Sequence, residues 1–477
     1  MSIEKVKILL LGVSSQSFFY DQVVIPFGLI SLASYIDDGS YVIKGIEMNS
    51  PSERIPKRYL NVDEELLKEI LAFSPDIVAM STYASNIYNV LFWADIIKKK
   101  LPHCFIIIGG NHASYIAQEC LEKSPGLDMV VKFEGEIPFK MICEKIKNKD
   151  YDFSNIPSLV YRANGDFKEN SQGKMIKNLS DLPLLNRDYF ADKTKSNNNV
   201  IHADVISARG CPYNCTFCDC NHYWNKVYRV RLIDSVIEEL KLLKMRYPNL
   251  KSVRFRDESI TINKERCRRL SEALIKNELN LELQAHSRLD GLNESIIKML
   301  AAAGFVLIFI GMESGSQKVL ERLQKGINIS RAEEIVSLLR KYGIKFRISF
   351  MSSTPNEKFS DILHTIKLIK KLNLKSNEYY IGTGVDIYPG TKECDIFLKL
   401  NPKYKWLSRS YDFKGRYRGI KDSKGNILHP SYGEHGTALT ILYRIVILLI
   451  LSNPTELVRY FKRIIRRSIR RIINLFN

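Results

Sequence analysis

The chain is organised around one stretch, Ser207-Ala-Arg-Gly-Cys-Pro-Tyr-Asn-Cys-Thr-Phe-Cys218. Cys211, Cys215 and Cys218 lie at offsets of four and three, and the glycine and proline beside them predict a loop. Three thiolates from one loop can converge on a 4Fe-4S cluster, and they leave one iron without a protein ligand, where another molecule can bind. We therefore predict an iron–sulfur site at these three cysteines.

Two other roles for the cysteines are open from the spacing alone. A zinc ion would need a fourth protein ligand if structural or a water if catalytic, and Cys220 and His222 follow closely enough to serve. Disulfides are less favoured, because nine cysteines in 477 residues with no secretory signal do not resemble an oxidised framework. The N-terminus runs directly into an apolar segment, so we expect a cytoplasmic protein whose thiols stay reduced.

The spacing C-x3-C-x2-C, with Phe217 directly before the third cysteine, resembles the motif of the radical S-adenosylmethionine (SAM) enzymes. The motif follows residues 202–208, a mostly apolar run that predicts a strand. The resemblance implies that the open iron binds SAM and that Phe217 lies beside this cofactor. It also implies that an electron from a flavodoxin- or ferredoxin-type reductant cleaves SAM, and that the resulting 5′-deoxyadenosyl radical abstracts hydrogen from a substrate.

Length and composition predict a large globular protein with an unusual charge. A chain of 477 residues suggests two or three domains. Hydrophobic residues make up 45% and charged residues 26%, which is ordinary for a folded protein. The net charge of +19 is not ordinary, and it is compatible with nucleic acid, an anionic membrane surface or anionic substrates.

The first third of the chain alternates predicted strands and helices. Buried strands are expected at residues 6–12, 41–46, 75–81, 104–110 and 129–133. Helices are expected at residues 26–36, 63–72, 90–100 and 113–122. This rhythm predicts a doubly wound, Rossmann-like α/β domain over residues 1–149, with helices on both faces of an open parallel sheet. Ligands of such sheets bind at the carboxyl ends of the strands.

Residues 1–149 resemble the cobalamin-binding domain that precedes the SAM domain in one class of radical SAM enzymes. Two segments at predicted strand ends carry the resemblance, Gly109-Gly110-Asn111-His112 and Glu134-Gly135-Glu136. The resemblance implies that these residues contact cobalamin. Without it, a Gly-Gly pair is often only a tight turn, and His112 is a residue that begins a helix. The D-x-H-x-x-G motif of other cobalamin proteins is absent, so we expect cobalt without a protein histidine.

Residues 150–200 are predicted to form a linker that contains a hairpin turning at Asn164-Gly165. From residue 201 the strand–helix rhythm restarts. Strands are predicted at residues 202–208, 252–256, 281–285, 306–311, 345–350 and 379–387. Six strand–helix units fit the open (β/α)6 barrel of radical SAM enzymes over residues 201–400. Active residues of parallel barrels lie at the carboxyl ends of the strands.

Two of these strand ends carry further matches to the family. Asp257 and Glu258 follow the second strand, where the resemblance implies contact with the methionine amino group of SAM. Glu313 and Ser314 lie in Gly311-Met-Glu-Ser-Gly315 after the fourth strand, and Glu313 is expected to reach the ribose or amino group of SAM. Without the resemblance, such carboxylates are ordinary features of turns at strand ends. Residues 352–357, after the fifth strand, lack the glycines usual in the family.

The C-terminal residues 401–477 are expected to cap the barrel and to end in a basic amphipathic helix. After Pro454, aliphatic residues fall on one predicted helical face and arginines fall largely on the other. Such a helix lies on an anionic membrane surface, so attachment at the inner face of the membrane is expected. Residues 438–451 are apolar but too short for a membrane span, which needs about 20 residues, and a buried core helix is the alternative.

Together these features predict a cobalamin-binding radical SAM enzyme that methylates an unactivated carbon or phosphorus of a small-molecule or lipid-like substrate. The expected cofactors are a 4Fe-4S cluster, SAM and cobalamin. One alternative is a cyclisation, rearrangement or carbon–carbon coupling without methyl transfer. Another is a membrane-tethered RNA-modifying or RNA-binding protein, although the sequence shows no recognisable RNA-binding module. No DNA partner is expected.

Deletion of residues 455–477 should release the protein from anionic vesicles. The segment carries seven Lys or Arg and one acidic residue, and each such cation contributes on the order of 1 kcal/mol near an anionic membrane. Co-sedimentation of the intact and shortened chains with vesicles, at low and at high salt, measures the effect. If the intact protein ignores anionic vesicles at low salt, the segment packs against protein instead.

Overall fold

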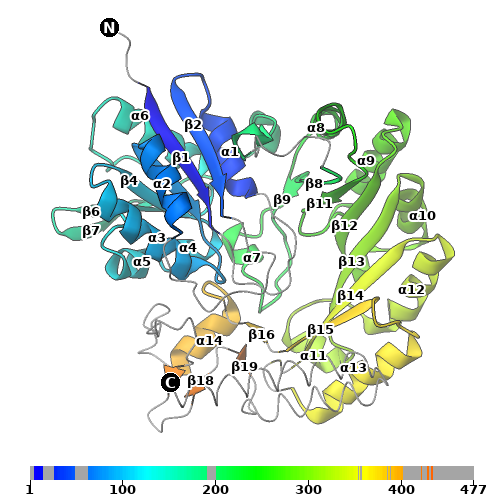
Figure 1. Cartoon of the computed structure of the whole chain (residues 1–477). Helices are drawn as coiled ribbons and strands as arrows, with labels where there is room; N and C mark the ends of the chain where they lie inside the picture. Colours follow the sequence, from blue (N-terminus) through cyan, green and yellow to red (C-terminus); the bar gives the residue numbers. More distant parts are fainter. Residues whose placement is uncertain are drawn as a thin grey trace.

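The computed structural model shows two α/β domains, each built around one sheet (Figure 1). It describes residues 5–13, 26–48, 63–190, 200–352, 354, 357–383, 385–386, 388–400, 420–421, 427–428 and 431–432. The predictions for residues 438–451 and for the basic tail fall outside these residues. No helix in the described part of the chain is long and apolar enough to cross a membrane.

The first domain is built on a seven-stranded sheet in the order β2-β1-β3-β4-β5-β6-β7. Its strands are β1 (Val6–Gly12), β2 (Tyr41–Glu47), β3 (Ile77–Ser81), β4 (Phe105–Gly109), β5 (Met129–Val131), β6 (Leu159–Ala163) and β7 (Asp166–Glu169). The first five strands pair in parallel, as predicted, whereas β6 and β7 pair antiparallel. The sheet is therefore a parallel sheet extended by a hairpin.

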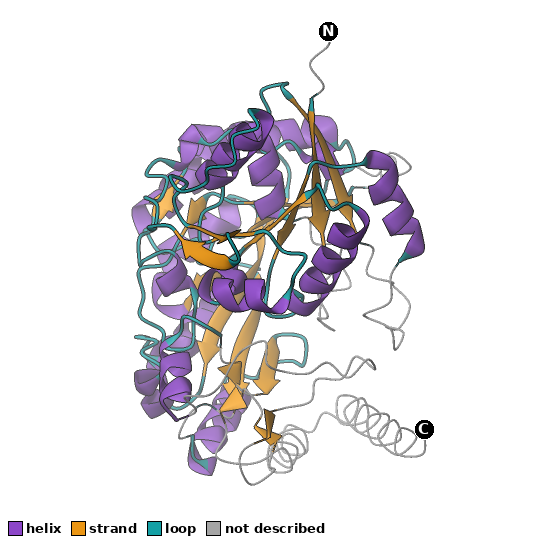
Figure 2. Ribbon diagram, turned by 90° about the vertical axis from the view of Figure 1, so that its left-hand side faces the viewer, coloured by secondary structure: helices purple, strands orange, loops and turns teal. Residues whose placement is uncertain are grey.

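Helices flank both faces of this sheet (Figure 2). They are α1 (Phe27–Ile36), α2 (Glu64–Phe73), α3 (Ile87–Lys100), α4 (Asn111–Tyr115), α5 (Ala117–Lys123) and α6 (Glu136–Lys147). Leu9 and Leu11 of β1 belong to the core beneath α2 to α5, whereas Ile8 and Leu10 belong to the core beneath α1 and α6. A strand buried on both faces requires such an unbroken apolar run.

The hairpin within the predicted linker is part of the first sheet. Asn164 and Gly165 have φ angles of 53° and 82°, and these positive values suit the tight turn predicted there. Val160 and Tyr161 pair with β5 and are buried, at 1% and 5% exposure. Residues 159–169 are therefore held by the sheet, because their apolar side chains complete its core.

The second domain is built on a six-stranded sheet in the order β15-β14-β13-β12-β11-β8, with all pairs parallel. Its strands are β8 (His202–Val205), β11 (Ser252–Phe255), β12 (Glu282–Arg288), β13 (Phe305–Glu313), β14 (Lys345–Ser352) and β15 (Tyr379–Thr383). The predicted run 202–208 is shorter in the structure. It divides into β8 and β9 (Ala208–Arg209), which pairs with β10 (Arg229–Val230).

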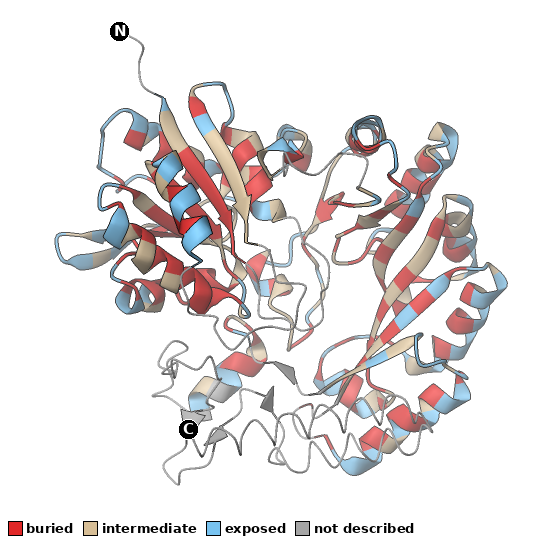
Figure 3. Cartoon of the chain, viewed as in Figure 1, coloured by how far each residue is buried: buried red, intermediate tan, exposed pale blue. Residues whose placement is uncertain are grey.

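Helices cover one face of the second sheet, on the outer side of the molecule (Figure 1). They are α8 (Ile233–Arg246), α9 (Lys264–Asn277), α10 (Glu294–Ala302), α11 (Gln317–Arg322), α12 (Ala332–Lys341) and α13 (Phe359–Lys371). Side chains of β14 alternate accordingly: Phe346, Ile348 and Phe350 are buried, whereas Lys345 and Arg347 are exposed (Figure 3). Six parallel strands with helices on one face form the predicted partial barrel.

Two helices of the first domain differ from the sequence prediction. The helix expected at residues 113–122 is divided between α4 and α5 at Ile116, whose φ of −128° is not helical. Helix α6 was not predicted, although Pro138 in its first turn is a residue that helices accept there. Its position matters for the site, because α6 begins directly at the predicted cobalamin-contact segment, with Gly135 as its N-cap.

Candidate active site between the domains

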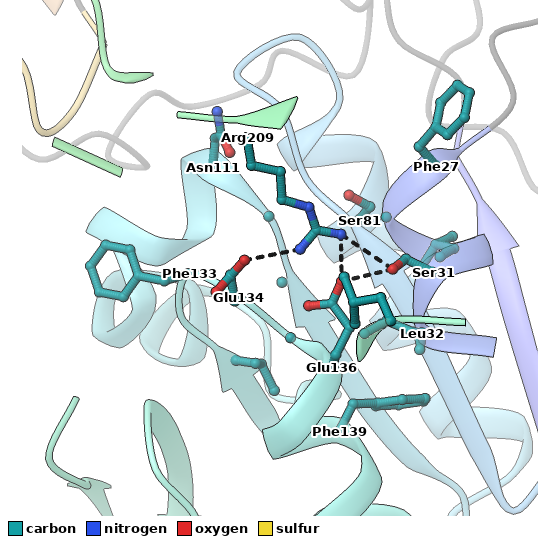
Figure 4. A pocket seen from close by; sticks show the side chains of 18 of the residues that line it. Phe27, Ser31, Leu32, Ser81, Asn111, Phe133, Glu134, Glu136, Phe139 and Arg209 are labelled. Carbon is teal, nitrogen blue, oxygen red and sulfur yellow. Dashed lines mark hydrogen bonds and ion pairs between the residues drawn. The ribbon is translucent and has the colours of Figure 1, made fainter. Parts of the chain in front are cut away.

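A cavity of about 280 Å³ lies at the carboxyl ends of the strands of the first sheet (Figure 4). The first domain lines it with the ends of β3, β4 and β5, and the second domain adds Ile206, Arg209, Tyr223, Trp224 and Arg231. The predicted contact residues that line it are Gly109, Gly110, Asn111, Glu134 and Gly135. The structure therefore gathers most of the predicted cobalamin contacts around one space between the two domains.

The Gly109-Gly110 pair is required by packing within the first domain. Gly110 has a φ of +98°, and a Cβ atom there would lie 2.8 Å from the carbonyl oxygen of Thr82. A Cβ atom at Gly109 would lie 3.1 Å from the carbonyl oxygen of Val131. The two glycines thus let β4 turn tightly into α4 at the wall of the cavity.

Asn111 and His112 begin α4 but have different surroundings. Asn111 lines the cavity, and its Nδ2 donates a hydrogen bond of 3.2 Å to Oδ2 of Asp219, the residue after Cys218. His112 is 8% exposed and is not among the residues that line the cavity. Asn111 therefore contacts the cysteine loop. His112 is buried and does not line the cavity.

A buried ion network joins the first domain to the segment that precedes the cysteines (Figure 4). Arg209 donates from Nη1 to Glu134 at 2.9 Å and from Nη2 to Glu136 at 2.7 Å. Ser31 Oγ donates to the same oxygen of Glu136 at 2.7 Å. Burial raises the pKa of Glu136, but the charge and hydrogen bond of Arg209, together with the hydrogen bond from Ser31, hold that pKa below its usual range. Glu134, a predicted cobalamin contact, is thus engaged by an arginine of the second domain.

The segment after the cysteines is fastened to the same wall. Arg229 Nη1 donates to Oε2 of Glu134 at 2.8 Å, and its guanidinium lies 5.2 Å from the ring of Trp224. Tyr223, at the end of α7 (Cys220–Tyr223), donates its hydroxyl hydrogen to the carbonyl oxygen of Phe133 at 2.6 Å. Both ends of the cysteine loop are therefore attached to the first domain.

The three cysteines lie on this loop between β9 and α7. Cys215 is 8% exposed, and Cys211 and Cys218 are partly buried. Burial raises the pKa of Cys211 to about 11, and the other two thiols add to the shift, so the three are electrostatic neighbours. Arg288 Nη1 lies 3.8 Å from Cys215 Sγ. Such a cation favours thiolates, which are the ligand form that an iron–sulfur cluster requires.

The cysteine loop is not arranged around a single metal ion. Within the described part of the chain, no group of three or more His, Cys, Asp or Glu side chains is placed to hold one. The thiolates of a four-iron cluster bind separate irons and do not need to meet at one point, so this set of donors suits such a cluster. Cys220 instead lies 3.4 Å from Oε1 of Glu258, to which its thiol donates.

Asp257 and Glu258 support the main chain of the cysteine loop. Asp257 is 2% exposed, and its Oδ1 accepts from the main-chain nitrogens of Ser207 and Ala208 at 2.7 and 3.1 Å. Its Oδ2 accepts from Ser207 Oγ at 2.6 Å. Glu258 accepts from the main-chain nitrogen of Gly210 at 3.1 Å. Contact of either carboxylate with SAM stays a prediction, for which Oδ2 of Asp257 retains one lone pair.

Glu313 forms a buried ion pair with Lys325 beside the cysteine loop, at 2.8 Å. Glu313 has a φ of +68°, and a Cβ atom at Gly311 would lie 2.6 Å from its Oε1, so glycine is needed for the carboxylate to reach Lys325. Lys325 Nζ lies 5.8 Å from the ring of Phe217. The structure brings Glu313 and Phe217 together around this lysine. Ser314 is fully buried and accepts from the main-chain nitrogen of Ser316 at 3.1 Å.

Sequence reasoning missed Arg209 and Arg288 as parts of the site. Arg209 stands two residues before Cys211, but its partners lie 75 and 73 residues away. Arg288 ends β12, beyond the predicted strand at 281–285, so its place at a strand end was not visible. A longer strand prediction was the one signal that would have found Arg288.

Comparison with known proteins matches both domains. The model of the radical SAM superfamily matches residues 205–384, and that of the B12 binding domain matches residues 20–142. An uncharacterized methyltransferase from Pyrococcus horikoshii is 31% identical over 71% of this chain and 72% of its own length. The cytidylyl-2-hydroxyethylphosphonate methyltransferase of Streptomyces wedmorensis is 24% identical, over 73% of each chain.

A solved structure has the same arrangement of domains. The radical SAM methyltransferase TsrM from Kitasatospora setae superposes with a TM-score of 0.74 at 15% identity, covering 95% of this chain and 90% of that chain. The solved structure thus shares the fold of this chain, a doubly wound domain facing a partial barrel. The chain belongs to the family of radical SAM enzymes that carry a B12-binding domain, and its cofactors are a 4Fe-4S cluster, SAM and cobalamin.

Substitution Arg209→Gln should lower the free energy of unfolding by about 3 kcal/mol, because Glu134 and Glu136 would stay buried without their cation. A second substitution, Glu136→Gln, should recover part of that loss. Urea unfolding of the single and double variants measures both effects.

The matched control for this experiment is Arg268→Gln. It removes an arginine that pairs with Glu265 and Glu272 on the exposed surface of α9, where ion pairs contribute little. A loss in Arg209→Gln no larger than in this control would contradict a role of the buried network in holding the domains together.

Proposed function

We propose that this enzyme transfers a methyl group to an unactivated carbon or phosphorus atom of a small-molecule or lipid-like substrate. The observation that carries the proposal is one cavity bordered by the predicted cobalamin contacts and by residues that flank the cysteines (Figure 4). A methyl donor and a radical source must act on one substrate, which requires their sites to face each other. The relatives named as methyltransferases support the same proposal.

The lining of the cavity suits a large, flat organic cofactor. Ile107, Ile108 and Val131 are apolar, and Tyr83 and Trp224 add aromatic rings. Cofactor sites are mostly apolar with a few polar groups that fix orientation, and these side chains would hold cobalamin in this way. Because the described residues of the lining include no histidine, we propose that the cobalt has no protein imidazole as its lower ligand.

Cys211, Cys215 and Cys218, on the loop whose flanking residues border the cavity, would hold the 4Fe-4S cluster. Phe217, Glu258 and Glu313 are the proposed SAM contacts, and Asp257 and Ser314 are proposed to position the main chain around them. When bound, the cluster with SAM supplies hydrogen abstraction, and cobalamin supplies a transferable methyl group. A flavodoxin- or ferredoxin-type protein is the proposed electron donor.

Substitution Cys215→Ala should abolish SAM cleavage, because a cluster deprived of one of three thiolates is not retained. Protein reconstituted anaerobically with iron and sulfide should hold about four irons in this site, and the variant should hold far fewer. Iron content and 5′-deoxyadenosine formation under reductant measure both effects. The matched control is Cys220→Ala, which should retain cluster and cleavage. Full activity in Cys215→Ala would rule out the assignment.

Electron paramagnetic resonance of the cobalt(II) protein should show no nitrogen splitting from an axial imidazole of the protein. The reason is that His112 is buried outside the cavity lining. The matched variant is His112→Ala, whose spectrum should equal that of the parent protein. Nitrogen splitting that disappears in His112→Ala would instead identify His112 as the lower ligand.

A further inference from the structure

Charged and aromatic side chains form a layered pattern on the helix-free face of the second sheet. In one layer, Arg254 pairs in register with Gln284, Gln284 with Leu307, and Leu307 with Lys345. In the next layer, His286 pairs with Phe309, and Phe309 with Arg347. Residues paired on neighbouring parallel strands point to the same face of the sheet. This face is turned toward the first domain (Figure 1).

Two rings form the centre of this surface. The rings of His286 and Phe309 lie 5.0 Å apart with their planes inclined by 22°, which is a stacked pair. The guanidinium of Arg254 lies 4.9 Å from the ring of Phe309, and its Nη2 donates to Oε1 of Gln284 at 2.9 Å. The ring pair is therefore a flat platform held in place by Arg254. We call Arg254, Arg256, His286, Phe309 and Arg347 the inner arginine surface.

Positive charge predominates on the inner arginine surface. Asp204 is the carboxylate beside it, and its Oδ2 accepts from Arg256 at 2.8 Å. Arg347 is exposed, and no carboxylate among the described residues pairs with it. Burial, together with Arg254 and Arg256, lowers the pKa of His286 to about 4, so the imidazole is neutral at pH 7. Among the described residues, this surface thus carries more guanidinium groups than carboxylates.

The inner arginine surface adjoins the cavity between the domains. Tyr83 lines that cavity with 55% of its surface exposed. Desolvation raises the pKa of Tyr83 although its outer surface is exposed, and the charge of Arg256 opposes the shift, so the two side chains are electrostatic neighbours. Arg256 also directly precedes Asp257, which supports the cysteine loop. A substrate that lies along the inner arginine surface past Arg256 would therefore extend toward the place where both cofactor sites meet.

We propose that the inner arginine surface binds an oxyanion of the substrate, a phosphoryl or carboxylate group, through Arg347, with the neighbouring His286–Phe309 platform against the adjoining part of the substrate. Guanidinium groups recognise such oxyanions through paired N–H donors of fixed geometry. Strong binding remote from the reacting atom holds that atom in place during a radical reaction. The inference rests on the proposed function, because it names the substrate class of that site.

The test uses the reconstituted holoenzyme with inorganic pyrophosphate and with acetate as probes, followed by isothermal titration at low ionic strength. We expect the wild-type protein to bind one or both probes, and Arg347→Gln to weaken that binding about tenfold, the effect of losing one charge-assisted contact. Arg347→Lys should fall between the two, because it keeps the charge without the paired donors. The preferred probe identifies phosphoryl or carboxylate as the group recognised.

The matched control is Arg269→Gln, an exposed arginine on α9 in the outer helical layer, which should bind the probes as the wild type does. Equal affinities in Arg347→Gln and the control would overturn the inference. SAM affinity is measured in the same variants, and a parallel loss for SAM in Arg347→Gln would also overturn it, because the arginine would then hold the carboxylate of SAM.

Two measurements on the wild-type protein, SAM cleavage and probe binding, distinguish failure of this inference from failure of the proposed function. If it forms 5′-deoxyadenosine from SAM under reductant but binds neither probe, the inference fails and the proposed function stands. If it binds a probe through Arg347 but does not cleave SAM, the proposed function fails, whereas the oxyanion site is retained.

Discussion

The pairing of Arg209 with Glu134 and Glu136 is the interaction on which the relation of the two domains depends. A buried arginine loses its hydration, and only carboxylates held at short distance offset that loss. The pair therefore penalises any movement that separates β9 from the start of α6. Gly210 follows directly, and a Cβ atom there would lie 2.0 Å from the carbonyl oxygen of Val227. Contacts with both domains therefore fix the position of the main chain directly before Cys211. A shift of the cavity wall in the first domain would move the start of the cysteine loop.

The same principle extends into the second domain, where buried charges surround the thiols. Lys325 is held by Glu313, and Arg288 donates to Asp290 at 2.9 and 3.0 Å while lying near Cys215. Each cation has a carboxylate partner, so neither is an isolated buried charge. Both cations oppose the rise that burial causes in the pKa of the Cys215 thiol, before any cofactor binds. Preorganised charge of this kind stabilises anionic ligands without rearrangement of the protein.

Apolar periodicity was sufficient to predict both sheets, because strands such as β1 are buried over most of their length and leave an unbroken apolar run. Side-chain partners were not predictable in the same way. Asp257 and Glu313 stand at strand ends, where a carboxylate can face either a ligand or the protein, and the sequence pattern is identical in both cases. The partners of Arg209 are more than 70 residues away and leave no local signal. The hairpin was recognisable from Asn164-Gly165, but its pairing with β5 depends on tertiary packing.

The effect of the net charge of +19 on a bound molecule depends on where the charged side chains lie in the structure. Arg187 and Arg231 share Glu239, and Arg209 and Arg229 share Glu134, so these buried arginines are matched by carboxylates and exert little field beyond their own network. Arg347 lies on an open face without such a partner among the described residues. An unmatched charge next to low-dielectric walls acts at longer range than one in open water. Basic residues at the inner face of the second sheet can therefore attract an anionic molecule, whereas the paired arginines cannot.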